Sequence, residues 1–259
     1  MRPLVVDSFM INDELDMLEC RLIELAEVVD YFIAVEADVD HQDHPKPYWL
    51  TENENRFKPW QKQLRIVRAK GMPTAKEAPD PWMREHAQRE FVQEALGKLE
   101  TNSDTIILHG DVDEIPTISA IQKVCELHPS ELLVFSQKLY CFAVDWLYPN
   151  HWLGTAASML NGVKNFNHMR DTRGTAPSIP NGGWHLSWLG GNEAQKKKLA
   201  TTPHLEIISR TTELIAKDTL YQKGMHVDGT QLIPVDVDQT WPKWIAEKRC
   251  PSNWLRPRH

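Results

Sequence analysis

The sequence predicts an α/β fold in which helices flank a mostly parallel β-sheet. Two observations predict it: short apolar runs rich in β-branched residues alternate with helical patterns, and several of these runs end in a carboxylate. Such runs are typical of strands buried on both faces, and strand–helix–strand units build parallel sheets through right-handed crossovers. At 259 residues the chain can bury one large core, or form one domain with a small lobe.

The opening of the chain contains the first strand–helix–strand unit. Residues 4–9 and residues 31–36 form apolar strand patterns. Between them, leucines recur at three- and four-residue spacing over residues 14–25, which predicts an amphipathic helix. Asn12 or Asp13 is expected to cap this helix, because either side chain can accept a hydrogen bond from its first turn.

The central stretch is an apolar strand pattern at residues 106–111, followed by the carboxylates of Asp111, Asp113 and Glu114. Ligands of open α/β sheets bind at the carboxyl ends of the strands, where these side chains would lie. Asp111 and Asp113 point the same way if extended, and like charges this close repel unless a cation joins them. The pattern predicts either a divalent cation that holds a diphosphate or a solvated acidic turn.

Two further segments are expected to bring polar groups to that edge. Glu36 ends a strand, and it either hydrogen-bonds a nucleoside or is solvated. Arg84 and Gln88 share a face of a long helix whose first turn lies near the strand ends, so both could reach a ligand there. Glu85 and Arg89 suit an i,i+4 ladder on the surface of the same helix.

The remaining elements follow from the same patterns. Strands are expected at residues 64–69, 132–144 (as one strand or a hairpin) and 181–188, and helices at residues 81–99, 118–127, 193–200 and 211–223. Irregular structure is expected at residues 37–59, at residues 145–180, in the turn at 226–230 and in an extended arm after Pro234. The basic triplet at residues 196–198 suits a solvated helix face.

A strand at residues 181–188 would alternate Trp184 and Trp188 on one face with His185 on the other. Indole rings stack on sugars, so both tryptophans are candidates for acceptor binding, although ordinary packing explains them equally well.

His185 is either a third metal ligand through a neutral imidazole nitrogen or a hydrogen-bonded structural residue.

The composition argues against several functional classes. Lys and Arg number 29 and Asp and Glu 36, a net charge of −7, so no nucleic-acid binding is expected. The four cysteines lack metal-ligand spacing and predict reduced, mostly buried thiols. Without a signal-peptide pattern or a membrane-spanning apolar run, we expect a soluble, cytoplasmic protein. Glycine-rich phosphate-binding motifs are missing, so any phosphate would have to be held through a metal.

Several short motifs occur in order between residues 7 and 231. They are Asp7-Ser8-Phe9 with Asn12-Asp13-Glu14-Leu15-Asp16, Val28-Val29-Asp30-Tyr31-Phe32 with Val35-Glu36, Arg84-Glu85 with Gln88-Arg89, Asp111-Val112-Asp113-Glu114-Ile115-Pro116, Gly183-Trp184-His185 with Ser187-Trp188, and Asp228-Gly229-Thr230-Gln231. Together they resemble glycosyltransferase family 17, the β-1,4-mannosyl-glycoprotein 4-β-N-acetylglucosaminyltransferases and their microbial and viral relatives.

The resemblance implies a GT-A-like fold, in which a Rossmann-type, mostly parallel sheet is joined to an acceptor-binding part. A single catalytic domain would then comprise a nucleotide-sugar-binding half (residues 1–116), an acceptor-binding half (117–233) and the C-terminal arm (234–259). It also implies an inverting transferase with a nucleotide-sugar donor, expected to be UDP-N-acetylglucosamine, a carbohydrate or glycoconjugate acceptor, and Mn²⁺ or Mg²⁺ as cofactor.

Each candidate residue has a role in such a transferase. The metal would be held by Asp113, with Asp111 and His185, and would neutralise the departing diphosphate as a Lewis acid. Donor-binding residues would be Asp7, Ser8, Glu36, Arg84, Gln88 and Asp111, and acceptor-binding residues Trp184 and Trp188. The general base that an inverting transfer needs would be Glu193, with Asp145 and Glu114 as rivals.

Two other functional classes are compatible with the same residues. A metal-dependent nucleotide-sugar or phosphate-ester hydrolase could use Asp111 and Asp113, and it would release product without an acceptor. A non-catalytic carbohydrate-binding module would explain the ten tryptophans, and it would bind glycans without Mn²⁺ or nucleotide.

Overall fold

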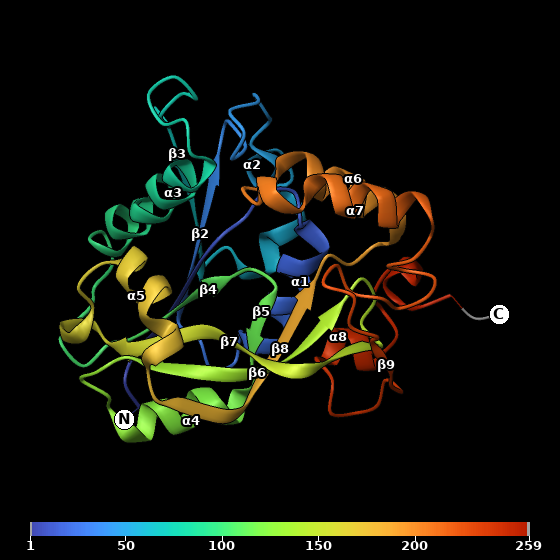
Figure 1. Ribbon diagram of the computed structural model, residues 1–259. Helices are drawn as coiled ribbons and strands as arrows, with labels where there is room; N and C mark the ends of the chain where they lie inside the picture. Colours follow the sequence, from blue (N-terminus) through green and yellow to red (C-terminus); the bar gives the residue numbers. More distant parts are fainter. Residues whose placement is uncertain (1, 258–259) are drawn as a thin grey trace.

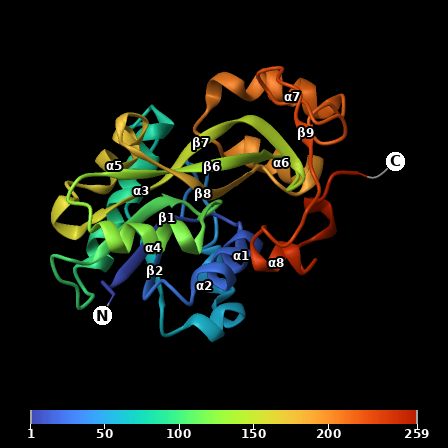
Figure 2. The ribbon, with the colours of Figure 1, turned by 90° about the horizontal axis from the view of Figure 1, so that it is seen from below.

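Over residues 2–257, the part of the chain that the computed structural model describes, helices cover both faces of a nine-stranded mixed β-sheet (Figures 1 and 2). In sheet order the strands are β3 (Leu64–Ala69), β2 (Tyr31–Ala37), β1 (Val5–Met10), β4 (Ile106–Asp111), β7 (Trp146–Met159), β6 (Leu133–Cys141), β8 (Ser178–Ser187) and β5 (Glu114–Pro116), while β9 (Ile233–Pro234) pairs with β7. The first four strands run parallel, as the sequence predicts, so their carboxyl ends meet at one edge. The other half of the sheet is mixed: β7 and β5 run antiparallel to their neighbours.

The helices alternate with these strands in the first part of the chain and follow them in the last. They are α1 (Leu15–Leu25), α2 (Trp49–Glu52), α3 (Pro81–Leu96), α4 (Ile118–Leu127), α5 (Phe166–Thr172), α6 (Gly191–Thr201), α7 (Ile208–Ala216) and α8 (Lys243–Ala246). Single 3₁₀ segments lie at Glu54–Trp60, Leu160–Gly162, Arg173–Thr175, Leu205–Ile207 and Ser252–Trp254. Within residues 2–257, none of the helices has both the length and the apolar character needed to cross a bilayer.

Neighbouring residues of β1 point to opposite faces of the sheet and into separate apolar clusters. Val5 packs in a cluster with α1, α4 and α8, whereas Val6 packs in another with α3 and α5. Burial on both faces explains why the first strands of the chain are continuous apolar runs. The thiols also agree with the expectation, since all four cysteines are free and Cys20 and Cys141 are buried.

Two segments expected to be irregular contain regular structure. Residues 145–180 form β7 and α5, which the sequence hides because one end of β7 is exposed and the other is built from small buried residues. Residues 37–59 include α2, whose first N–H groups are satisfied by the buried carboxylate of Glu36. It accepts hydrogen bonds from the N–H of Leu50 (2.8 Å) and the N–H of Thr51 (3.0 Å).

The C-terminal arm packs into the core instead of lying extended on the surface. Trp241, Trp244 and Trp254 are buried in the cluster that contains α1, and the N–H of Lys243 donates to Glu24 of α1 at 2.8 Å. Burial of these large apolar rings stabilises the fold, so packing in the core accounts for part of the tryptophan content. The cap expected from Asn12 or Asp13 is not formed, since Glu14 occupies the N-cap position of α1 and no side chain caps it.

A buried ion pair fixes α1 to the sheet. Arg21 of α1 donates to both carboxylate oxygens of Asp7 in β1, at 2.7 Å each, and both side chains are fully buried. The same guanidinium donates to the carbonyl oxygens of Asp111 (3.1 Å) and Glu114 (2.8 Å). Helix α1 therefore holds the backbone of the loop that follows β4, which carries the acidic side chains.

We expect Arg21→Met to lower the free energy of unfolding by about 3–5 kcal/mol, because it leaves the Asp7 carboxylate buried and unpaired. Urea denaturation followed by circular dichroism measures the loss. The matched control is Arg249→Met, which removes an exposed guanidinium that pairs with Glu247 and should leave stability unchanged. Equal midpoints for the Arg21 variant and the wild type would show that the pair does not stabilise the fold.

Candidate active site

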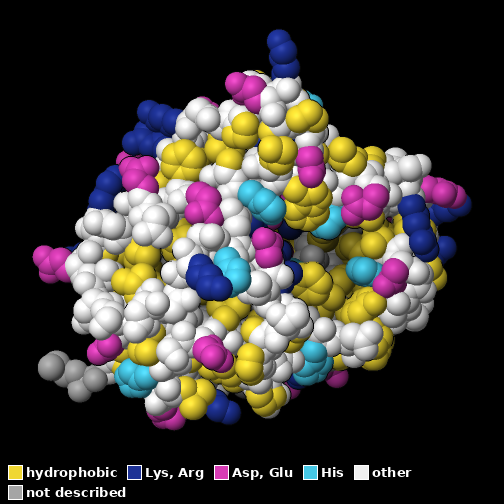
Figure 3. Space-filling view, turned by 60° about the vertical axis from the view of Figure 1, so that its left-hand side comes forward, with side chains coloured by type: hydrophobic (Ala, Val, Ile, Leu, Met, Phe, Trp, Pro, Cys, Tyr) yellow, Lys and Arg dark blue, Asp and Glu magenta, His cyan; other side chains and the backbone are white. Residues whose placement is uncertain are grey.

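A cavity of about 810 Å³ opens at the carboxyl edge of the sheet. Asp111 lines it from the end of β4, Asp113 from the loop that follows, His185 from β8, Gln88 from α3 and Lys198 from α6. Figure 3 shows a hollow in the surface with histidine, acidic and basic side chains at its rim. The segments that meet here are far apart in the chain, so the cavity exists only in the folded protein.

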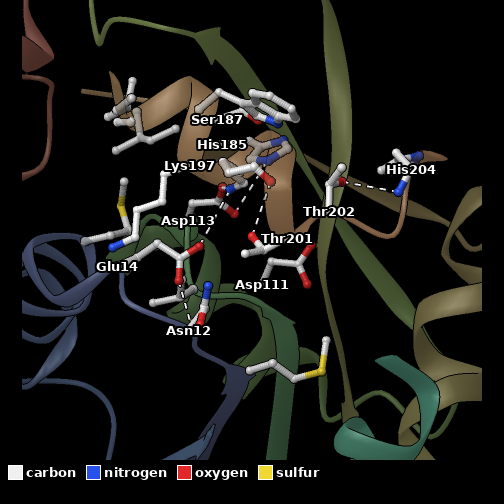
Figure 4. A pocket seen from close by; sticks show the side chains of 18 of the residues that line it. Asn12, Glu14, Asp111, Asp113, His185, Ser187, Lys197, Thr201, Thr202 and His204 are labelled. Atoms are coloured by element: carbon white, nitrogen blue, oxygen red, sulfur yellow. Dashed lines mark hydrogen bonds and ion pairs between the residues drawn. The ribbon is translucent and has the colours of Figure 1, made fainter. Parts of the chain in front are cut away.

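The short strand β5 brings the acidic loop to His185. After β4 the chain crosses to β8, where Glu114 pairs with His185 and the N–H of Leu186 donates to the carbonyl oxygen of Asp113 at 2.9 Å. Close approach of the two backbones requires Gly183, because a Cβ there would lie 2.1 Å from the carbonyl oxygen of Ile115. As a result, Oδ1 of Asp113 lies 3.6 Å from Nε2 of His185 (Figure 4).

Lys198 of α6 is the second partner of Asp113. Its Nζ lies 3.6 Å from Oδ2 of Asp113 and 3.7 Å from Oε1 of Glu14. Burial alone would raise the pKa of Asp113, but the charge of Lys198 and the interaction with His185 outweigh it and lower that pKa to about 2. Asp113 is therefore ionised at neutral pH and faces the cavity as a carboxylate.

Asp111 and Glu114 are bound by arginines from α5 and the turn after it. Arg170 donates to Asp111 at 2.5 Å and to Glu114 at 2.9 Å, and Arg173 donates to Glu114 at 2.9 Å. Burial would raise the pKa of Glu114, yet the two guanidinium groups hold it far below its ordinary value. Burial among the other carboxylates raises the pKa of Asp111 despite the opposing charge of Arg170.

Two of the three predicted metal ligands fit a shared cation. Adjacent ligand atoms of a Mg²⁺ or Mn²⁺ ion, each at about 2.1 Å, lie roughly 3 Å apart, close to the Asp113–His185 separation. Nδ1 of His185 is buried without a hydrogen-bond partner, and the ring packs against Trp152 with 4.9 Å between the ring centroids. Asp111 would have to exchange Arg170 for the metal. Within residues 2–257 no group of three or more acidic, histidine or cysteine side chains is already arranged as a metal site.

The structure places most of the predicted donor-binding residues away from the cavity. Asp7 is buried against Arg21, Ser8 Oγ donates to the carbonyl oxygen of Leu108 at 2.9 Å, and Glu36 caps α2. Arg84 is buried and donates to the carbonyl oxygens of His41 (2.7 Å) and Ala78 (2.5 Å). Of this group, Gln88 and Asp111 line the cavity. The carboxylates of Asp7 and Glu36 were expected to face a ligand, but each is paired with a group inside the protein.

The three predicted general bases also lie outside the cavity lining. Glu193 is exposed on α6, where it pairs with Lys196. Asp145 is buried and accepts hydrogen bonds from the N–H (2.8 Å) and Nε (3.1 Å) of Arg256. Glu114 is fully buried, and besides the two arginines it accepts a hydrogen bond from the indole N–H of Trp152 at 2.7 Å. A proton acceptor needs access to its substrate, so this geometry favours none of the three.

The two predicted acceptor-binding tryptophans are separated. Trp188 lines the large cavity, whereas Trp184 lines a second one of about 380 Å³ together with Tyr140 and Trp241.

Glu85 and Arg89 of α3, expected to pair on the surface, form a buried pair, and Arg89 also donates to Asn167 of α5 at 2.8 Å. The polar stripe of α3 thus faces α5 and not solvent.

The sequence did not single out the cations that balance the cavity. Lys198 belongs to the basic triplet that was expected to be solvated, and only Lys196 and Lys197 have largely exposed side chains. Arg170 and Arg173 lie in the stretch expected to be irregular. A cation in sequence gives no sign of the distant carboxylate that it will meet, so these pairs had no local signal.

The comparisons with known proteins agree with the resemblance seen in the sequence. The sequence model of glycosyltransferase family 17 matches residues 1–226. Two proteins named beta-1,4-mannosyl-glycoprotein 4-beta-N-acetylglucosaminyltransferase, from Rattus norvegicus and Homo sapiens, are each 23% identical to the chain over 264 aligned residues. The match covers 88% of this chain and 49% of either relative, so the chain spans about half the length of these proteins.

The comparison with solved structures gives a match of low similarity. The inositol-1-phosphate CTP transferase from T. maritima shares 9% sequence identity with the chain and superposes with a TM-score of 0.37, over 71% of this chain and 87% of that one. The mixed α/β architecture described above, together with the family match, agrees with the expected GT-A-like fold.

We expect Arg170 and Asp111 to be energetically coupled. Arg170→Met removes the cation that neutralises Asp111, so it should destabilise the fold more in the wild-type background than in an Asp111→Asn background. A double-mutant cycle by urea denaturation should give a coupling energy of about 1–3 kcal/mol. Additive effects of the two substitutions would mean that the observed pair contributes nothing to stability.

Proposed function

Since the chain belongs to glycosyltransferase family 17, we propose that it is a metal-dependent, inverting transferase that moves N-acetylglucosamine from UDP-N-acetylglucosamine to a hydroxyl of a carbohydrate or glycoconjugate. Its membership makes it a glycosyltransferase, and the names of its relatives support this sugar. The observation that carries the proposal is the Asp113–His185 pair at the wall of the large cavity.

The donor diphosphate would lie against Asp113, His185 and Lys198. A divalent cation bound by Asp113 and His185 would supply Lewis-acid stabilisation of the negative charge on the departing nucleoside diphosphate. Lys198 would exchange Asp113 for a phosphate oxygen, since its side chain is long and flexible and its ammonium is a compact charge. The exchange preserves charge balance, because the carboxylate then has the metal as its partner.

Arg170 would play a supporting part at Asp111. In the structure its guanidinium is paired with Oδ2 of Asp111, so Asp111 would become a third metal ligand only when Arg170 releases it. Arg170 would then keep its other partner, Glu114. Glu114 is fully buried and retains Arg173 as a second cation. The arginine pair can therefore release Asp111 without leaving a buried charge unpaired.

The acceptor would approach on the side of Trp188. Its indole lines the same cavity as His185, and an apolar ring face suits the C–H groups of a pyranose. Trp184 lies in the second cavity, so a direct role in acceptor binding is proposed for Trp188 alone.

We expect calorimetry to detect UDP binding that depends on Mn²⁺. Asp113→Ala should weaken that binding by at least about tenfold, because it removes a first ligand of the metal. Asp104→Ala, at an exposed turn before β4, is the matched control and should bind as the wild type does. Metal-independent UDP binding of equal strength in all three proteins would contradict the metal site. Rapid release of free sugar in the absence of any acceptor would favour a hydrolase.

The role of Lys198 can be separated from that of its neighbours on α6. With Mn²⁺ present, Lys198→Gln should weaken UDP binding by about 10- to 100-fold and leave uridine binding unchanged, because a charge-assisted contact to phosphate is lost. Lys196→Gln, which removes an exposed ammonium two positions before Lys198 and outside the cavity lining, should have no effect. An unchanged UDP affinity in the Lys198 variant would exclude it from the diphosphate site.

A further inference from the structure

His226 lines the large cavity, and Asp228 lies beside it. They lie in a tight turn between α7 and β9, which Met225 and Gln231 close as a β-bridge. The N–H of His226 donates to the carbonyl oxygen of Thr230 at 2.8 Å, and Gly229 adopts a positive φ of 92°. The turn is thus fixed by its own backbone, and it presents the imidazole of His226 to the cavity.

Asp228 is held as a carboxylate behind this imidazole. Oδ1 accepts a hydrogen bond from the N–H of Thr230 at 2.8 Å, and Oδ2 accepts one from the hydroxyl of Tyr148 in β7 at 2.8 Å. Partial burial would raise the pKa of Asp228, but these donors and His226 hold it well below its usual range. A permanently ionised carboxylate is therefore available beside the ring.

The ring of His226 lies near two aromatic side chains. Its centroid lies 4.8 Å from the ring of Tyr148 in β7 and 6.1 Å from that of Phe142, which follows β6. Nδ1 lies 3.0 Å from Oδ1 of Asp228, although the N–H direction is not yet aligned for a hydrogen bond. A small rotation of the ring would align them, as catalytic hydrogen bonds often tighten only when substrate binds.

Cys141 at the end of β6 lines the same cavity, as do Leu139 of that strand and Phe142, which follows it. Burial raises the pKa of the Cys141 thiol, and the charges of Asp228 and Asp113 add to that effect. The large cavity is therefore lined both by the proposed metal pair, Asp113 and His185, and by His226.

Several other titratable side chains at the cavity already have competing partners. Asp13 pairs with Lys197, Asp16 with Arg56 and Glu85 with Arg89, and Asp40 accepts from the N–H groups of Gln42 and His44. His151 contacts the hydroxyl of Ser136, and His204 pairs with Glu206 at a rim where both are largely exposed. Unlike these side chains, His226 lines the cavity with a carboxylate 3.0 Å from its ring and that carboxylate is itself held by Tyr148 and Thr230.

We propose that His226 is the general base of the transfer reaction, with Asp228 as its positioning residue; this inference rests on the proposed glycosyltransferase function. The neutral imidazole takes the proton of the acceptor hydroxyl through Nε2. The hydroxyl oxygen forms its bond to the anomeric carbon as the bond from that carbon to the diphosphate oxygen breaks, and the diphosphate leaves with the electron pair. Asp228 fixes the tautomer through Nδ1–H and stabilises the imidazolium that forms.

The test measures UDP release from UDP-N-acetylglucosamine with Mn²⁺, with methyl β-mannoside or water as acceptor. His226→Gln should lower kcat by about 10²- to 10⁴-fold, while calorimetry shows UDP affinity unchanged. Asp228→Asn should lower kcat less and also leave UDP affinity unchanged. The matched control is His204→Gln, which removes another cavity histidine and should retain full activity.

Two further readouts distinguish a base from a structural residue. The wild-type rate should fall on acidification, because a protonated imidazole cannot accept a proton, and this limb should be missing in His226→Gln. The other titratable or charged groups around His226 are Asp228, Tyr148, Cys141 and Arg210. Arg210 approaches the turn at Gly229, where its Nη2 would lie 3.5 Å from an added Cβ. Free imidazole should partly restore turnover to His226→Ala.

The outcomes separate the two levels of inference. An active wild type with an equally active His226→Gln variant overturns the base and leaves the transferase intact. A wild type that neither binds UDP with Mn²⁺ nor releases it from the donor overturns the proposed function, and the base with it. Loss of kcat without loss of UDP affinity, together with imidazole rescue, supports the base.

Discussion

The pairing of β5 with β8 is the contact on which the candidate site depends. The chain leaves the parallel half of the sheet after β4 and adds three residues to the far edge of the mixed half. Cross-strand register then sets Glu114 opposite His185, and Asp113 next to its ring. Arg21 holds the same loop through its carbonyl oxygens. Side chains fixed by backbone hydrogen bonds on strands keep their geometry far better than side chains on free loops.

Charge balance explains why helices from the second half of the chain reach the first. Three carboxylates in four positions would repel one another in a partly buried site, and each needs a cation. The structure supplies these cations from α5 and α6: Arg170 neutralises Asp111 and Glu114, and Lys198 neutralises Asp113. The proposed metal and diphosphate would bring charges of opposite sign. Their arrival would change partners within the site without creating an unpaired buried charge.

The two faces of β8 have separate surroundings. His185 and Trp188 contribute to the large cavity, while Trp184 points into the smaller one with Tyr140 and Trp241. Helix α3 likewise has two different surroundings, because its apolar end packs on the sheet and its polar end is buried against α5. In both elements the polar side chains are placed by their neighbours, and their own spacing does not reveal which face they serve.

The sequence by itself determined the elements whose signal is local. Periodicity located β1, α1, β2, β3 and β4 to within about two residues, and α4 at Ile118–Leu127. It also located the acidic loop and His185, which the structure brings together. Tertiary structure alone decided the partners. Asp7, Glu36 and Asp145 look like candidate site residues in sequence, but each is buried against a donor far along the chain. Lys198 and His226 join the cavity for the same reason: the energy of a charge depends on what surrounds it in space, and sequence spacing does not record that environment.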